Sequence, residues 1–130
     1  MLTLTIHQLG DVTVFRCVGR ITAEDRDALR IAVVTRPHLR IAVLDLAEVG
    51  TVDAAGLGTL VSLQQWAKTN GRKLKLMNLT PRVEEVLELT NLRSTLDVCS
   101  VEDMVDLLCR ATSQARSAAP DAAFKWASGF

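Results

Sequence analysis

Three cysteines and two histidines are the side chains of this sequence most suited to metal binding or catalysis. Cys17, Cys99 and Cys109 lie far apart and form no CxxC pair, and His7 and His38 have no third partner near them in the sequence. Because a structural zinc site needs four clustered ligands, we expect no metal site. An odd number of unpaired thiols favours reduced cysteines in or near the core of a cytoplasmic protein.

Other patterns typical of enzymes are weak. Asp45 ends an apolar run, where an α/β enzyme often carries a catalytic acid, but no paired base accompanies it. The sequence has no GxGxxG or GxxxxGK[ST] segment, and the two glycines of residues 56–58 (GLG) are a poor basis for binding phosphate. We therefore predict a protein that is not an enzyme and that binds no cofactor.

Asp53 precedes a long helical pattern and is well suited to cap it, because its carboxylate can accept hydrogen bonds from amides two or three residues ahead. Ala54, Ala55 and Gly56 leave the first turn sterically open, so a partner's backbone or an anion could approach the free amides. Gly58 lowers helix stability by about 1 kcal/mol relative to alanine. Small residues at positions 56 and 58 fit a partner contact and also fit close packing of the helix on a sheet, and spacing alone does not separate the two.

The elements that position these residues follow from hydrophobic periodicity. Residues 2–6 and 12–18 alternate like two strands around a Gly10-Asp11 turn, which predicts a hairpin. A helix capped by Thr22 follows and ends by Pro37. The nearly continuous apolar residues 41–46 are typical of a central strand with parallel neighbours. A loop over residues 47–52 then leads into a helix over residues 54–70.

The second half of the chain continues the alternation of strands and helices. We expect a peripheral strand over residues 73–78, a helix beginning at Pro81, a short strand over residues 96–99 and a helix capped by Ser100. The order predicts an α/β fold, with a mixed sheet of about five strands packed against about four helices. Trp66 fits either the edge of the core or an interface with a partner.

Length and composition are those of one soluble domain. The chain has 130 residues, of which 48% are hydrophobic and 23% charged, and its formal net charge is zero. A neutral chain is a poor candidate for general nucleic-acid binding or for an anionic membrane surface, and no apolar run reaches the length of a bilayer span. We expect a domain over residues 1–112 and an Ala/Ser-rich tail over residues 113–130. The tail carries Phe124, Trp126 and Phe130. It is either folded back on the domain or a dispensable extension, or else it is a short docking peptide or a self-association segment.

Residues 43–58 carry the most distinctive pattern, in which the apolar strand leads through a loop into residues 53–58 (DAAGLG). This pattern resembles the signature of STAS domains, named for sulfate transporters and anti-sigma factor antagonists, where the strand leads into Asp-Ser-Ser-Gly-Leu-Gly at a helix start. Residues 19–22 (GRIT) are similar to the family's Gly-x-Leu-Asp turn, and the resemblance extends to about residue 108. It implies a single STAS-like domain.

The resemblance also implies a phosphorylation switch. In the phosphorylated anti-sigma factor antagonists, a kinase-type anti-sigma factor phosphorylates the second serine of Asp-Ser-Ser-Gly, and the unphosphorylated form binds that kinase and frees a sigma factor. The matching positions here are Ala54 and Ala55, and neither can accept a phosphate. The expected regulator of bacterial transcription therefore lacks the usual acceptor, at Ala55.

Three interpretations stay open. In the favoured one, the domain is a cytoplasmic, non-enzymatic module that binds an anti-sigma factor of the serine-kinase type without phosphorylation. In another, phosphate goes to a nearby hydroxyl, with Thr51 more reachable than Thr59 or Ser62. In the third, the domain is a scaffold subunit of a lipid or anion transporter complex, without inserting into the membrane itself; homodimer formation is also left open. The expected partner-binding residues are Arg20, Thr22, Thr51, Asp53, Ala54, Ala55, Gly56, Leu57 and Gly58.

Overall fold

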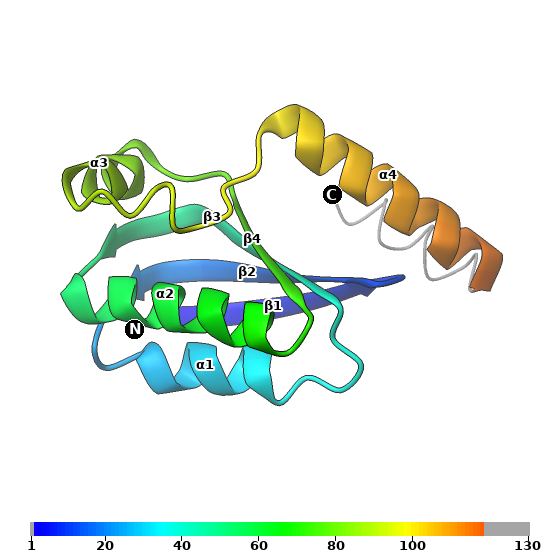
Figure 1. Cartoon of the computed structure of the whole chain (residues 1–130), viewed down its shortest axis with the longest axis horizontal. Helices are drawn as coiled ribbons and strands as arrows, with labels where there is room; N and C mark the ends of the chain where they lie inside the picture. The colour runs from blue at the N-terminus through cyan, green and yellow to red at the C-terminus, as the bar shows by residue number, and fades with distance from the viewer. Residues whose placement is uncertain (1, 119–130) are drawn as a thin grey trace.

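The computed structural model describes the backbone of residues 2–118 and the side chains of residues 2–113. One sheet carries helices on both faces (Figure 1). The elements are, in chain order, β1 (Leu2–Leu9), β2 (Val12–Ile21), α1 (Arg26–Val34), β3 (Ile41–Val52), α2 (Ala54–Thr69), β4 (Lys73–Met77), α3 (Pro81–Leu89) and α4 (Val101–Ala118).

The sheet is mixed and has the strand order β1-β2-β3-β4. β1 and β2 form the predicted antiparallel hairpin, whose two-residue turn begins at Gly10 with a φ of 57°. Glycine is favoured at this position because an L side chain rarely adopts a positive φ. β3 is parallel to both β2 and β4, which confirms it as the central strand covered on both faces.

Two predicted segments differ in the structure. Residues 47–52, expected as a loop, continue β3, because Val49 and Val52 pair with the end of β2 and bury their side chains. Residues 96–99, expected as a strand, form only an isolated bridge between Val98 and Leu76. The described residues therefore form a four-stranded sheet where about five strands were expected, while the α/β class and the four helices are as predicted.

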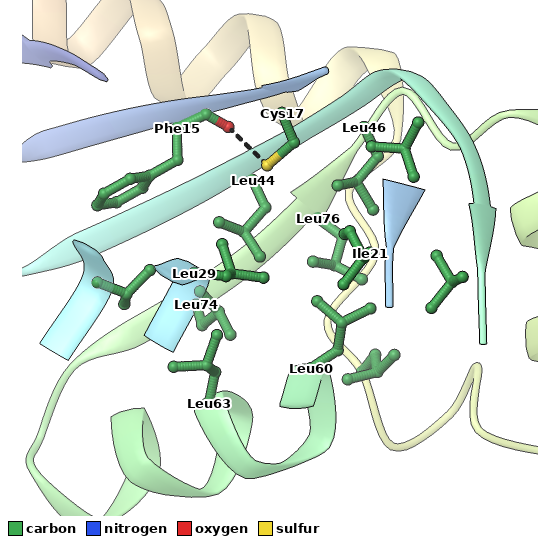
Figure 2. Packing of buried hydrophobic residues seen from close by; sticks show 14 of the residues in the cluster. Phe15, Cys17, Ile21, Leu29, Leu44, Leu46, Leu60, Leu63, Leu74 and Leu76 are labelled. Carbon is green, nitrogen blue, oxygen red and sulfur yellow. Dashed lines mark hydrogen bonds between the residues drawn. The ribbon is translucent and has the colours of Figure 1, made fainter. Parts of the chain in front are cut away.

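The two faces of the sheet are covered unequally. α1, α2 and α3 pack on one face around a large cluster of buried residues that includes Phe15, Leu44 and Leu60 (Figure 2). α4 covers the other face through a smaller cluster that includes Val14, Val43 and Met104 (Figure 1). Alternate residues of the central strands feed the two clusters, which is the expected consequence of the two-residue period of a strand.

The helix starts agree with the sequence at three of four places. Asp53, Thr80 and Ser100 accept hydrogen bonds from amides three residues ahead, at Gly56, Val83 and Asp103. α1 is the exception. Thr22 does not cap it; the helix begins after Asp25, whose own carboxylate makes no capping bond because it is bonded elsewhere.

The expected tail begins within an observed helix. α4 continues to Ala118, beyond the expected boundary at residue 112, and Phe124, Trp126 and Phe130 lie outside the described residues. The division into a domain and a tail stays a prediction. Among the helices of the described part of the chain, none combines the length and apolar character that crossing a membrane requires.

Candidate functional site

The start of α2 is joined to the turn after β2 by the carboxylate of Asp53. One oxygen, Oδ1, accepts a hydrogen bond from the Gly56 amide at 2.7 Å, and the other, Oδ2, accepts one from the Ala23 amide at 3.3 Å. The Asp53 amide in turn donates to the Ile21 carbonyl at 3.3 Å. Asp53 therefore holds residues 19–23 and the first turn of α2 side by side, as one surface at the carboxyl ends of β2 and β3.

The structure separates the roles of the two glycines. A Cβ atom on Gly56 would lie 2.0 Å from the Ile21 carbonyl oxygen and 2.9 Å from its carbon, so only glycine lets α2 sit this close to β2. A Cβ atom on Gly58 would meet nothing within 4 Å. The packing interpretation therefore holds for Gly56, whereas Gly58 faces open space.

The nine expected partner-binding residues divide by exposure. Gly56 and Leu57 are buried beneath the surface and leave no room for direct contact with a partner. Thr22, Thr51 and Ala55 are half-buried. The exposed members are Arg20, Asp53, Ala54 and Gly58.

The hydroxyl groups near Ala55 differ in their availability. Thr59 is 8% exposed and donates to the Ala55 carbonyl at 3.0 Å, so its hydroxyl lies inside the helix packing. Thr51 is half-buried and sits in register with Arg20 of the neighbouring strand. Ser62 is exposed on α2. By exposure, Ser62 is therefore more accessible than the sequence suggested, and Thr59 less.

Thr22 belongs to a network that the sequence did not indicate. Its hydroxyl donates to Oδ2 of Asp25 at 3.1 Å, and Oδ1 of the same carboxylate accepts the Leu2 amide at 3.1 Å. Asp25 is buried, so these two bonds replace the water that its carboxylate loses on folding. Thr22 thus serves the packing of β1 against the turn.

A groove of about 540 Å³ runs between α1 and α2 beside Ala55 and Gly58. Arg26 and Arg30 line it from α1, and Trp66 lines it from α2, where the Arg72 guanidinium lies 5.7 Å from the centre of its ring. Trp66 is half-buried and packs on the core, as the core-edge interpretation predicted, and it also lines the groove, so its role at a partner interface stays a prediction. In the sequence, the (i, i+4) spacing of Arg26 and Arg30 places both side chains on one face of a helix, and this pattern could have indicated the groove.

Ionisable groups with shifted pKa values lie away from this surface. Burial, reinforced by the Asp45 carboxylate, raises the pKa of Cys17 to about 12. Partial burial also raises the pKa of Cys99. Partial burial lowers the pKa of Lys75, but the hydrogen bond and charge of Asp97 at 3.0 Å outweigh it, and the net shift is upward. Within residues 2–118, no group of three or more His, Cys, Asp or Glu side chains is arranged to hold a metal.

Comparison with known proteins identifies the class to which this fold belongs. A family model described as "Mlab, STAS domain" matches residues 4–105. The chain therefore belongs to the STAS-domain family.

Solved structures extend this similarity to the fold. The Thermotoga maritima protein TM1081 is 19% identical, with a TM-score of 0.70 over 81% of this chain and 93% of that one. The anti-sigma factor antagonist SpoIIAA of Bacillus is 15% identical, with a TM-score of 0.65 over 83% of this chain and 96% of that one. A sulfate transporter family protein of Wolinella succinogenes is 16% identical, with a TM-score of 0.68 over 84% of this chain and 93% of that one.

Proposed function

We propose that this STAS domain is a cytoplasmic, non-enzymatic module that binds an anti-sigma factor of the serine-kinase type and thereby releases a sigma factor. The observation that carries the proposal is the joined surface at Asp53, where small residues leave the first turn of α2 open to a partner. SpoIIAA, an anti-sigma factor antagonist, has a similar fold. Ala55 stands where the resembling proteins carry the phosphorylated serine, so binding here is constitutive.

The groove supports the choice of this surface. Ala55 and Gly58 form its α2 side, and Arg26 and Arg30 form its α1 side. Small side chains allow close approach of a partner's backbone, while arginine and tryptophan are favoured at protein interfaces. We infer that a partner contacts Arg20, Ala54, Ala55 and Gly58 directly, and that Gly56 and Leu57 act by positioning α2.

A glutamate at position 55 tests the surface. In Ala55→Glu, a longer, charged side chain would project from the first turn of α2 into the groove, and we expect partner affinity to fall by about a hundredfold, the effect of losing a central interface contact. Titration calorimetry with the purified anti-sigma factor measures this. Folding is preserved, because an acidic residue in the first turn of a helix is favourable.

Ala28→Glu is the matched control. Like Ala55, Ala28 is an alanine in the first turn of a helix, but it is exposed and does not line the groove. This variant is expected to bind like the original protein. Equal affinities of the original protein and Ala55→Glu would remove the groove from the interface.

A second candidate function is that of a scaffold subunit in a lipid or anion transporter complex, favoured by the fold similarity to the sulfate transporter family protein. Restoring the serine separates the two. In Ala55→Ser, a kinase-type anti-sigma factor should incorporate phosphate from ATP at position 55, detected by intact-protein mass spectrometry, whereas Ala54→Ser should stay unmodified. Capture of transporter subunits from the source lysate by the original protein, with no kinase-type anti-sigma factor among them, would favour the scaffold instead.

A further inference from the structure

The two edges of the sheet differ in whether another segment is hydrogen-bonded to the edge strand. At the β4 edge, the Leu76 amide donates to the Asp97 carbonyl and the Cys99 amide donates to the Leu76 carbonyl, both at 2.8 Å, so a following segment covers that edge. At the other edge, β1 pairs with β2 along all of Leu2–Leu9 without a bulge, and among residues 2–118 no strand lies on its outer side. Within the described residues, β1 is therefore an edge strand of eight residues with no strand beside it.

The hydrogen-bond pattern of the hairpin shows which groups are free. Leu9 and Val12 close the two-residue turn as a bonded pair, and bonded and non-bonded pairs alternate along an antiparallel ladder. The even-numbered residues of β1 thus direct their N–H and C=O groups outward. The Leu2 amide does so and is bonded to Asp25 at 3.1 Å. Within residues 2–118, the corresponding amides of Leu4 and Ile6 have no bond to any element outside the sheet.

The side chains of β1 do not protect this edge. Natural proteins usually block an open edge with lysine, proline, a bulge or an inward-pointing charge. The sequence of β1, LTLTIHQL, contains no Asp, Glu, Lys, Arg or Pro, whereas the covered edge strand β4 carries Lys73 and Lys75. Ile6 is 36% exposed although it faces the same side as the buried Leu2.

The alternation of apolar and polar side chains along β1 allows this strand to pair with the same strand of a second copy. A second copy placed antiparallel, with its two-fold axis at Thr5, sets Leu4 opposite Ile6 of that copy, and the outward N–H and C=O groups of this pair then face each other. Leu4 and Ile6 meet on the helix side of the sheet, and Thr5 meets Thr5 on the other side. In the central pairs apolar contacts apolar (Leu4 with Ile6) and polar contacts polar (Thr5 with Thr5, Thr3 with His7), which no register shifted by one residue provides; only the outermost pair sets an apolar residue, Leu2, opposite a polar one, Gln8.

We propose that β1 is a homodimerisation edge, through which two copies of this chain join their sheets into one antiparallel continuation centred on Thr5. The strand that pairs with β1 comes from a second copy, because this register pairs the outward N–H and C=O groups of Leu4 and Ile6 in both chains at once. An isologous two-fold contact requires such a match. A single strand pair buries less surface than a standard stable interface, so the dimer is in the micromolar range or weaker.

Charge reversal at the two-fold axis tests this register. Thr5 is exposed, and in either Thr5→Lys or Thr5→Glu the axis brings two identical charges together, which should weaken the dimer by about tenfold or more. An equimolar mixture of the two variants should restore a dimer, because lysine then faces glutamate. Sedimentation velocity of the full chain over a concentration series measures all three samples.

Val18→Lys is the matched control, since Val18 is 37% exposed on the adjacent strand β2, away from the edge, and this variant should dimerise like the original protein. Amide hydrogen exchange gives an independent readout: the Leu4 and Ile6 amides should gain protection as concentration rises. The proposal is overturned by a monomer at every concentration, by a dimer that persists in both charged variants, or by a mixture that stays monomeric.

Discussion

Cys17 shows how the core controls the chemistry of one residue. Its side chain is fully buried between the sheet and the helices and donates a hydrogen bond to the Phe15 carbonyl at 3.6 Å (Figure 2). Burial raises its pKa from 9.0 to about 12, so the folded protein keeps the proton that the unfolded chain releases above pH 9. The thiol is consequently inert toward oxidants and alkylating agents unless the protein unfolds.

We predict a loss of stability at alkaline pH that depends on Cys17. Between pH 9 and pH 12 the unfolded state binds fewer protons than the folded state, so the free energy of unfolding falls as pH rises. This one thiol contributes a slope of up to about 1.4 kcal/mol per pH unit. Urea unfolding of the original protein and of Cys17→Ala, at pH 8 and at pH 10.5, measures it.

All other titrating groups are common to the two proteins, so the difference between their stabilities isolates the thiol. The advantage of the original protein over Cys17→Ala should shrink at the higher pH. A difference that stays constant with pH would show that the folded protein releases the Cys17 proton as easily as the unfolded chain.

At the candidate site, local pattern predicted the residues that act within one helix turn. Asp53 as cap and the small side chains that follow it are visible in the sequence because a cap bonds only three residues ahead. The bond of Asp25 with Leu2, and the position of Arg30 and Trp66 along one groove, were not predictable, since they bring together residues distant in the chain. The expected phosphate acceptors were ranked without knowledge of burial.

At the scale of elements, the position of α2 on the sheet rests on one glycine. Gly56→Ala would force a methyl group against the Ile21 carbonyl, which is backbone and cannot turn aside. We expect the free energy of unfolding to fall by about 2 kcal/mol or more, the effect of overpacking a tight contact. Gly58→Ala adds a methyl group in open space and should raise it by about 1 kcal/mol through helix propensity.

Thermal and urea unfolding of both variants check these opposite signs, each variant serving as the control for the other. Equal effects at the two positions would mean that α2 does not pack on β2 in this way. A higher stability of Gly58→Ala would also show that glycine at position 58 does not serve the stability of the protein.

The elements themselves were largely predictable, and the exceptions have a common cause. Strong local periodicity identified the hairpin, the central strand and all four helices. The end of β3 was missed because β4 pairs only as far as Asp45, so residues 47–52 have a single neighbouring strand and expose polar side chains. Residues 96–99 were predicted to form a strand because they are partly apolar. They pair with β4 only at Leu76 before α4 begins, which is too little for a strand.

At the scale of the whole molecule, the two candidate interaction surfaces lie on different parts of the sheet. The candidate partner surface lies at the carboxyl ends of two parallel strands, the usual place for binding sites in α/β sheets, while the open edge lies along the antiparallel strand. α4 covers the face that α1 and α2 leave free, so neither face of the sheet centre remains available. A formal net charge of zero leaves these shaped surfaces, rather than a long-range field, to select partners.

The first turn of α2 has a consequence for how such a protein can change over evolutionary time. At Gly56 the backbone of Ile21 leaves no room for a side chain, whereas Ala54 is exposed and Ala55 is half-buried. Serine and alanine therefore fit there with little difference in stability. Under the proposed function, a lineage can thus lose or regain a phosphate acceptor through single substitutions while the fold is kept, so a regulated protein and a constitutive one are close neighbours in sequence space.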